Sequence, residues 1–206
     1  MTSSPCFAQA SVRAFFLPNV RNNDNVTFKE VANILRKEGI GVLPTDTIYG
    51  IVGSALRLRT VERIYKLRKR NRKKPMIILI GSIADLKRFE VKVDTKIKKI
   101  LKRFWPGKVS IILPCPSKRF AYLHRGTKTL AFRLPVKKSL CALLHKTGPL
   151  VAPSANIESK PPAKTISEAK KYFGEKVDFY VDAGYLFPRP SKIIKLEKGG
   201  INFIRK

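Results

Sequence analysis

The chain has 206 residues, enough for one domain with a substantial core, and 44% of them are apolar. Its 43 Lys and Arg against 14 Asp and Glu give a net charge of +29. This composition excludes a disordered chain and favours a globular protein that meets polyanions, such as nucleic acids, nucleotides or anionic lipids. A general lysine bias without a dedicated partner stays open, because the basic residues are spread along the whole chain.

Cysteine and histidine usage narrows the class of protein further. Cys6, Cys115 and Cys141 are widely separated and odd in number, so we expect no disulfide framework and a reducing compartment. His124 and His145 offer little material for a zinc site, and we expect both to be structural or surface residues rather than catalytic bases. The sequence shows neither a secretory leader nor an apolar run of membrane-spanning length. We therefore expect a cytoplasmic protein without membrane contact.

The predicted elements begin after an irregular lead-in over residues 1–26, and residues 27–206 are expected to form one domain. Thr27 and Glu30 are spaced as a capping box, which predicts a helix that Gly39 ends. The elements expected next are a strand over 40–44, a helix from Thr60 to about Arg70, a strand over 76–80, helices beginning at Ser82 and Asp94, strands over 109–113 and 129–134, a helix over 136–146, a strand over 150–152, a helix beginning at Thr165, and strands over 178–182, 192–196 and 201–205. Because strands and helices interleave and some strand connections lack a helix, we expect an α/β fold with a mixed sheet.

Three polar segments carry the candidate chemistry. Residues 44–50 (Pro-Thr-Asp-Thr-Ile-Tyr-Gly) follow one apolar strand, and residues 152–156 (Ala-Pro-Ser-Ala-Asn) follow another. Residues 68–75 form a dense basic loop, whose guanidinium groups suit phosphate or carboxylate. Ligands bind at the carboxyl ends of strands in open α/β sheets, so these segments predict one cleft. Taken alone, each segment also has an interpretation without a ligand. Segments 44–50 and 152–156 are then ordinary turns, and the basic loop is a solvated charged loop.

Several familiar signatures are absent from the sequence. It contains no Walker A motif, no GxGxxG fingerprint and no GxSxG elbow. A bound nucleotide must therefore be held by side-chain and loop donors rather than by a glycine-rich phosphate cradle.

Taken together, the order and spacing of the motifs resemble the YrdC-like threonylcarbamoyl-AMP synthases of the short, single-domain bacterial type. The resemblance covers roughly residues 27–205 and rests on segments 44–50, 68–70, 74–75, 104–107, 129–135, 153–156, 181–184 and 190–191. It implies a twisted sheet, flanked by helices, around a positively charged concave cavity. The implied reaction joins L-threonine, bicarbonate and ATP into threonylcarbamoyl-adenylate and releases pyrophosphate.

The resemblance also implies partners and a cofactor requirement. The product serves the N6-threonylcarbamoyl modification of adenosine 37 in tRNA, so tRNA or double-stranded RNA and downstream threonylcarbamoyl-transfer proteins are the expected partners. ATP is a substrate, and Mg²⁺ is expected to arrive on its phosphates without a protein-built metal site.

Site residues are transferred by matching motif positions. The threonine site is expected to contain Thr47, Arg133, Ala152 and Ser191, with Arg133 pairing with the substrate carboxylate. The ATP site is expected to contain Arg70, Lys74, Thr129, Ser154, Pro162 and Arg205. The catalytic group is expected to comprise Arg68, Arg70, Ser154 and Asn156.

The chain departs from the family pattern at five positions, one of which is Asn71 in place of the usual Pro after Arg70. Arg68 stands where the family usually has Lys, which changes donor geometry, and Lys108, Lys192 and Leu79 replace a common Pro, Thr and His. Two alternatives to the enzyme remain open at this point. One is a non-catalytic RNA-binding module that uses the same basic cavity, and the other is a carbamoyl-transfer domain related to hydrogenase maturation.

Overall fold

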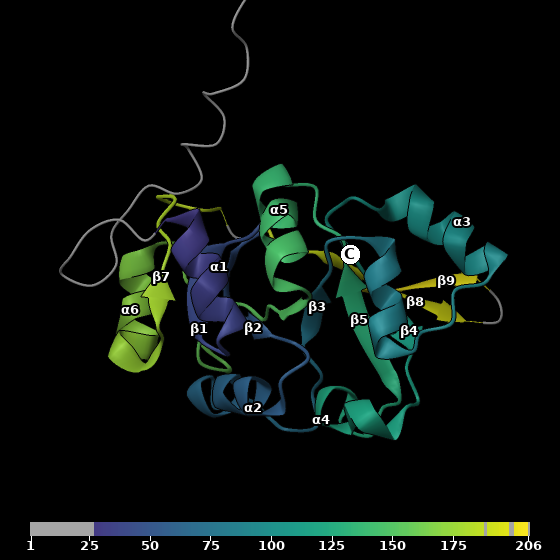
Figure 1. The fold of residues 1–206 in the computed structure, drawn as a ribbon, viewed down its shortest axis with the longest axis horizontal. Coiled ribbons are helices and arrows are strands. Elements are labelled where there is room, and N and C mark those ends of the chain that lie inside the picture. Colours follow the sequence, from purple (N-terminus) through teal and green to yellow (C-terminus); the bar gives the residue numbers. More distant parts are fainter. Residues whose placement is uncertain (1–26, 188, 198–199, 206) are drawn as a thin grey trace, which may run out of the picture.

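The framework of the molecule is a mixed β-sheet, seen in a computed structural model that describes residues 27–187, 189–197 and 200–205. Within these residues the sheet has nine strands in the order β7-β1-β2-β6-β3-β5-β4-β8-β9 (Figure 1). The strands are β1 (Ile40–Pro44), β2 (Tyr49–Ser54), β3 (Ile77–Leu79), β4 (Val109–Pro114), β5 (Thr129–Arg133), β6 (Leu150–Val151), β7 (Phe179–Tyr180), β8 (Lys192–Glu197) and β9 (Gly200–Arg205). Three neighbouring pairs, β1–β7, β3–β5 and β4–β8, are parallel and the others antiparallel, which confirms the predicted mixed sheet.

Helices connect these strands. The α-helices are α1 (Phe28–Arg36), α2 (Leu58–Leu67), α3 (Thr95–Phe104), α4 (Ala121–His124), α5 (Lys138–Thr147) and α6 (Ile166–Phe173). Helices α1, α3 and α6 start directly after the predicted capping residues, whereas α2 starts at Leu58 and not at the predicted Thr60. Thr27 and Glu30 form both hydrogen bonds of the predicted capping box, while Asp94 caps α3 and Thr165 caps α6 through their side chains. Helix α1 packs against α5, and α2 packs against β2 and α4.

Some predicted bounds were wrong, for local reasons. Strand β2 was not predicted, because Tyr49–Ser54 begins within the segment 44–50, which was interpreted as a strand exit. Helix α2 ends at Leu67 rather than near Arg70. Lys69 has a φ of 48°, in the left-handed region, and a right-handed helix cannot continue through such a residue. The helix expected after Ser82 is a 3₁₀ helix over Ile83–Phe89, and the short helices over 118–124 were not predicted. The predicted lead-in over 1–26 lies outside the described residues.

The two faces of the central strands differ in what they contact. Phe132 of β5 points to one face, where it packs against Phe89 with ring centroids 5.0 Å apart, and Phe89 in turn contacts Phe120 at 5.3 Å. These three rings are buried and belong to the main apolar core. Because side chains alternate along a strand, Ala131 and Arg133 of β5 point to the opposite face, where the candidate site lies.

Within the described residues, no helix combines the length and apolar character that crossing a membrane requires.

Candidate active site

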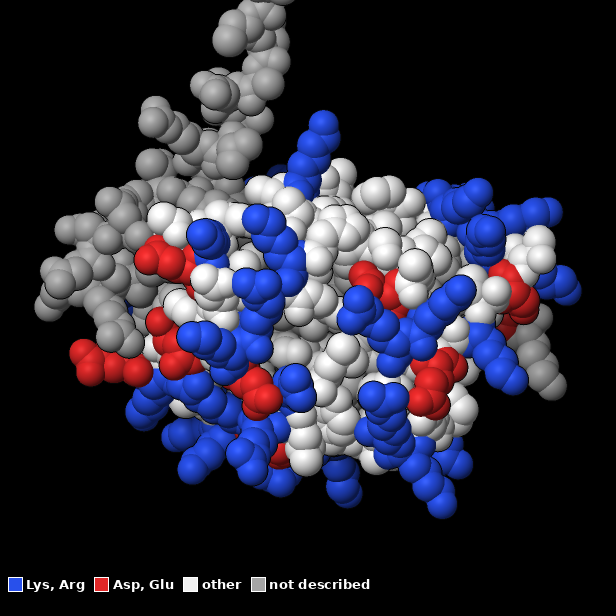
Figure 2. All heavy atoms as spheres, in the orientation of Figure 1, with Lys and Arg blue, Asp and Glu red and all other residues white. Residues whose placement is uncertain are grey.

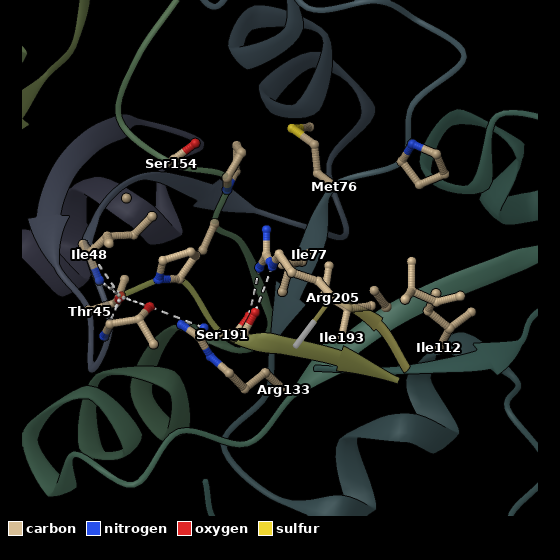
Figure 3. A pocket seen from close by; sticks show the side chains of 18 of the residues that line it. Thr45, Ile48, Met76, Ile77, Ile112, Arg133, Ser154, Ser191, Ile193 and Arg205 are labelled. Atoms are coloured by element: carbon tan, nitrogen blue, oxygen red, sulfur yellow. Dashed lines mark hydrogen bonds between the residues drawn. The ribbon is translucent and has the colours of Figure 1, made fainter. Parts of the chain in front are cut away.

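A cavity of about 470 Å³ lies over this second face of the sheet (Figure 3). Its lining contains four arginines, Arg68, Arg70, Arg133 and Arg205, and no aspartate or glutamate among the described residues. The remaining lining residues are threonine, serine, proline and small or apolar side chains: Thr45, Thr47, Ile48, Gly50, Pro75, Met76, Ile77, Ile112, Thr127, Thr129, Ala131, Ala152, Pro153, Ser154, Pro162, Pro190, Ser191, Ile193 and Ile204. Volumes of this order are typical of small-molecule sites.

The floor of the cavity is the sheet itself. Ala131 of β5 is paired with Ile77 of β3 and with Ile112 of β4, so these three lining residues form a row across adjacent strands. Thr129 and Arg133 flank Ala131 at alternate positions of β5 and line the same cavity. From the sequence, the site was expected at the strand ends. The structure instead places its floor on a sheet face, and the strand-end segments form its walls.

One wall is the tight turn between β1 and β2. The Thr45 hydroxyl donates to the Ile48 carbonyl at 2.7 Å and accepts from the backbone N–H groups of Thr47 and Ile48 at 3.2 Å. The segment 44–50 is therefore both a hairpin turn and a cavity wall, so the two interpretations that the sequence left open are compatible. Gly50 packs closely against the same turn, because a Cβ there would lie 3.2 Å from the Thr45 methyl carbon.

Thr47 links this turn to Arg133. The Arg133 Nη1 donates to the Thr47 hydroxyl at 3.2 Å, and Nη2 lies 3.0 Å from Oδ1 of Asp46. Burial lowers the pKa of Arg133, Asp46 raises it, and the neighbouring positive charge of Arg205 lowers it again. The Arg133 Nε is buried and has no hydrogen-bond partner, so this guanidinium retains an unused donor.

The opposite side of this end of the cavity comes from β4, β8 and β9. Ser191 contacts the hydroxyl of Ser110 at 2.9 Å, and both side chains are buried. Arg205 of β9 donates to the Ser191 carbonyl at 2.8 Å and to its hydroxyl at 3.2 Å (Figure 3). Arg205 was expected in the ATP site, and the structure places it against a residue expected in the threonine site.

Arg68, Ser154 and Asn156 form one hydrogen-bonded group. The Arg68 Nε donates to the Asn156 backbone carbonyl at 3.0 Å, and Nη2 donates to the Asn156 side-chain oxygen at 2.9 Å and to the Ser154 hydroxyl at 3.2 Å. Burial, followed by the charge of Arg70, lowers the pKa of Arg68 to about 10. The Arg68 Nη1 is buried without a partner, as Nε of Arg133 is.

Of the two basic-loop residues predicted for the ATP site, Arg70 lines the cavity and Lys74 does not. Arg70 donates to the carbonyls of Lys74 and Pro75 at 3.1 and 2.9 Å, which fixes its guanidinium against its own loop. Lys74 is exposed and pairs with Glu158 at 2.9 Å, and the Glu158 carboxylate also accepts from the Asn71 backbone N–H. These contacts lower the pKa of Glu158.

The cavity gathers most of the residues predicted for the site. Those that line it are Thr47, Arg68, Arg70, Thr129, Arg133, Ala152, Ser154, Pro162, Ser191 and Arg205. Lys74 and Asn156 do not line it: Lys74 is held outside by Glu158, and the Asn156 side chain is fully engaged with Arg68, Ser154 and backbone carbonyls. Sequence reasoning did not assign roles to Thr45 and Thr127, or to the strand residues of the floor, because their positions depend on strand register.

Histidines and cysteines lie apart from the cavity lining. His124 is buried, accepts from the Gly126 N–H through Nδ1 and contacts the Ser117 carbonyl through Nε2, which is a structural role. His145 is exposed. Cys115 and Cys141 are free thiols, and burial raises the pKa of both. Cys6 lies outside the described residues.

Comparison with known proteins places this fold and site in a family. The Sua5/YciO/YrdC family model, described as "Telomere recombination", matches residues 33–206, and the chain belongs to this family. It is 32% identical to a putative threonylcarbamoyl-AMP synthase of Methanocaldococcus jannaschii, over 86% of each chain. It is also 32% identical to the threonylcarbamoyl-AMP synthase of Bacillus subtilis, over 75% of this chain and 45% of that protein.

A solved structure of Pyrococcus abyssi Sua5 in complex with L-threonine superposes with a TM-score of 0.79 and 27% identity, covering 88% of this chain and 55% of that one. The chain thus spans about half the length of several of the relatives it matches.

Proposed function

We propose that the protein is a threonylcarbamoyl-AMP synthase. In this reaction the amine of L-threonine attacks the carbon of bicarbonate, and loss of water leaves a carbamate. A carbamate oxygen then attacks the α-phosphorus of ATP, the bond to the β-phosphate oxygen breaks, and pyrophosphate leaves. The products are L-threonylcarbamoyladenylate and pyrophosphate.

The observation that carries this proposal is the charge of the cavity. Four arginines and several hydroxyl groups line it, and no carboxylate does among the described residues. Bicarbonate, the threonine carboxylate and the triphosphate are all anionic, so their mutual repulsion is the main obstacle to bringing them together. Fixed guanidinium groups offset that repulsion and orient the reacting atoms, which is how a site without an acid–base residue in its lining can accelerate this reaction.

The two ends of the cavity suit the two organic substrates. Thr47, Arg133, Ala152 and Ser191 supply a guanidinium and two hydroxyls at one end, which suits a small hydroxy amino acid. At the other end lie Arg68, Arg70, Thr129, Ser154 and Pro162, which suits a nucleotide and its phosphates. Arg205 lies next to Ser191, and we assign it to the junction where the carbamate meets the α-phosphate. Asn156 acts through Arg68 and Ser154, and Lys74 lies outside the cavity.

Magnesium fits this site only together with the nucleotide. Among the described residues, no three carboxylate, histidine or cysteine side chains are grouped so that they could hold a metal ion. Mg²⁺ characteristically binds phosphate oxygens and water with few protein ligands, so we propose that it enters with ATP. Its role there is to neutralise charge on the leaving pyrophosphate.

We further propose that tRNA is a partner and that it contacts helix α3. Between Asp94 and Glu158 the chain contains no acidic residue. Helix α3, at the start of this segment, exposes Lys96, Lys98, Lys99, Lys102 and Arg103, and the ion pairs of the described residues involve none of them. Figure 2 shows Lys and Arg side chains gathered at the end of the molecule where Figure 1 labels α3. Such a surface suits a phosphate backbone.

Two other functions compete with this proposal. A non-catalytic RNA-binding module would need the exposed cations but not the buried arrangement of Arg68 with Ser154 and Asn156, which favours the enzyme. A carbamoyl-transfer domain of hydrogenase maturation shares the fold: a full-length HypF structure superposes with a TM-score of 0.74 at 18% identity, a likeness of fold alone.

Threonine-dependent pyrophosphate release tests the proposal. We expect the purified protein to release pyrophosphate from ATP and bicarbonate only when L-threonine is present. Arg70→Ala should lower this rate at least about 100-fold, because it removes a positioned charge from the cavity. Arg72→Ala is the matched control, because it also removes an arginine side chain from this loop. The Arg72 side chain is 73% exposed and does not line the cavity. Equal rates with and without threonine would reject the enzyme.

A further inference from the structure

Asp46 is the one charged residue of the turn between β1 and β2, and the proposed reaction gives it no role. Its side chain is only 2% exposed, yet it does not line the cavity. It lies behind Arg133, with Oδ1 3.0 Å from Nη2 of that guanidinium, and Oδ2 accepts from the Val136 backbone N–H at 3.4 Å. A buried carboxylate is costly unless it is paired, so its position is tied to Arg133.

The contacts of Arg133 define which of its donors remains for a ligand. Nη1 is used by the Thr47 hydroxyl at 3.2 Å, and Nη2 faces Asp46. Nε is buried and has no partner. Two groups from the same turn, a hydroxyl and a carboxylate, therefore contact the two terminal nitrogens of the guanidinium. Because a guanidinium has five N–H donors, Nε and a further N–H on each terminal nitrogen remain.

Charge balance leads to the same conclusion. Arg133 and Arg205 both line the cavity, and the charge of Arg205 lowers the pKa of Arg133 while the charge of Asp46 raises it. The charge of Asp46 also acts on Lys137, in the segment that leads into α5, and on the Cys141 thiol of α5, and it acts to raise the pKa of both groups. One carboxylate cannot neutralise both arginines, so the pair still attracts a second anion of carboxylate size.

We propose that Asp46 is a positioning residue for amino-acid recognition: it holds the Arg133 guanidinium in place so that its remaining N–H groups donate to the substrate carboxylate. This inference rests on the proposed function and deepens it. Asp46 itself does not touch the substrate. Its carboxylate and the Thr47 hydroxyl contact the two terminal nitrogens of the guanidinium, which restricts how that group can turn toward the incoming carboxylate.

The test compares Asp46→Asn, Asp46→Glu and the wild-type protein. Asp46→Asn should raise the KM for L-threonine about 10-fold or more, the size expected for a weakened charge-assisted hydrogen bond, and leave the KM for ATP within about twofold. Asp46→Glu keeps the charge but displaces it by one methylene, and should give an intermediate KM for threonine. Asp178→Asn is the control, because it breaks the 2.7 Å pair with Arg63, away from the cavity lining.

The pH dependence supplies a readout that a purely structural role would not change. Burial and Arg205 lower the pKa of Arg133, and Asp46 opposes them. Removing Asp46 therefore lowers the pKa of Arg133 further, and threonine binding by Asp46→Asn should weaken at a lower pH than in the wild type.

Calorimetric binding of L-threonine separates this proposal from the proposed function. If the wild type binds threonine but makes no adenylate, the reaction is wrong, and the variants still test Asp46. A threonine affinity of Asp46→Asn equal to that of the wild type overturns the inference, as does an equal rise in the KM values for threonine and ATP. If Asp46→Asn does not fold, an unchanged threonine KM in Asp46→Glu overturns it.

Discussion

At the scale of single residues, Arg68 shows how a substitution changes a site without dismantling it. A lysine has one nitrogen, whereas Arg68 uses Nε and Nη2 to reach two oxygens of Asn156 and the Ser154 hydroxyl. The guanidinium therefore holds the segment 154–156 in place through hydrogen bonds and also contributes positive charge to the cavity. The residue that departs from the family pattern has become part of the scaffold of this site.

This leads to a prediction for Arg68→Lys, the residue the family usually has. A lysine can replace one of the three hydrogen bonds, so we expect the variant to unfold about 1–3 kcal/mol more easily and to lose at least about 10-fold in turnover. Thermal unfolding and pyrophosphate release measure the two effects. Turnover equal to the wild type would show that the charge alone matters at this position.

At the scale of elements, the sequence predicted most of the helices and strands because their signals are local. The capping box of α1, the Asp94 cap of α3 and the Thr165 cap of α6 are all formed as the residue types predict. The motifs also predicted ten of the residues that line the cavity, including Thr47, Arg133 and Ser191.

The errors share a different origin. Neither the floor of the cavity nor the link from Arg133 to Asp46 could be predicted, because both depend on the register of strands that are distant in the sequence. Likewise, β2 was missed because its pairing with β1 is decided by the hairpin, not by a pattern within Tyr49–Ser54. Residues 181–184 were assigned to the family pattern, and the structure shows that they contact Tyr49, whose hydroxyl donates to the Gly184 carbonyl at 2.8 Å.

The hairpin turn yields a prediction at this scale. The Thr45 hydroxyl makes three backbone hydrogen bonds that close the turn, so Thr45→Val should lower the free energy of unfolding by about 1–3 kcal/mol. Because the turn carries Thr47 and Asp46, the KM for threonine should rise as well. Thr95→Val, at the exposed start of α3, is the matched control. Unfolding midpoints that are equal for the two variants in urea would contradict this account of the turn.

At the scale of the whole molecule, charge is unevenly distributed. The acid-free segment between Asp94 and Glu158 includes α3, whose cations are exposed, and β5, which carries Arg133 into the cavity. A positive field around the cavity raises the local concentration of anionic substrates and favours polyanion binding at the surface. The surroundings of α1 provide the contrast, because acidic residues, Glu30 and Glu38, lie in the sequence among the basic residues there.

Replacing Lys96, Lys99 and Arg103 by Gln should therefore weaken tRNA binding and reduce its salt dependence. Each lost phosphate contact should reduce the slope of log K against log salt by roughly 0.7 to 0.9. The control replaces Lys29, Arg36 and Lys37 around α1 by Gln, which removes the same charge from another surface. Adenylate formation from free substrates should not change in either variant. An equal loss of RNA affinity in both would indicate net charge rather than a surface on α3.

The central claim, that this cavity makes threonylcarbamoyl-adenylate, is tested most directly by isolating the product. The protein is incubated with L-threonine, carbon-14 bicarbonate and α-phosphorus-labelled ATP, and each substrate is omitted in turn. We predict a single species that carries both labels and has the mass of L-threonylcarbamoyladenylate, and that is lost upon omission of any one substrate. Pyrophosphate release without a doubly labelled species, or a doubly labelled species that forms without threonine, would contradict the account.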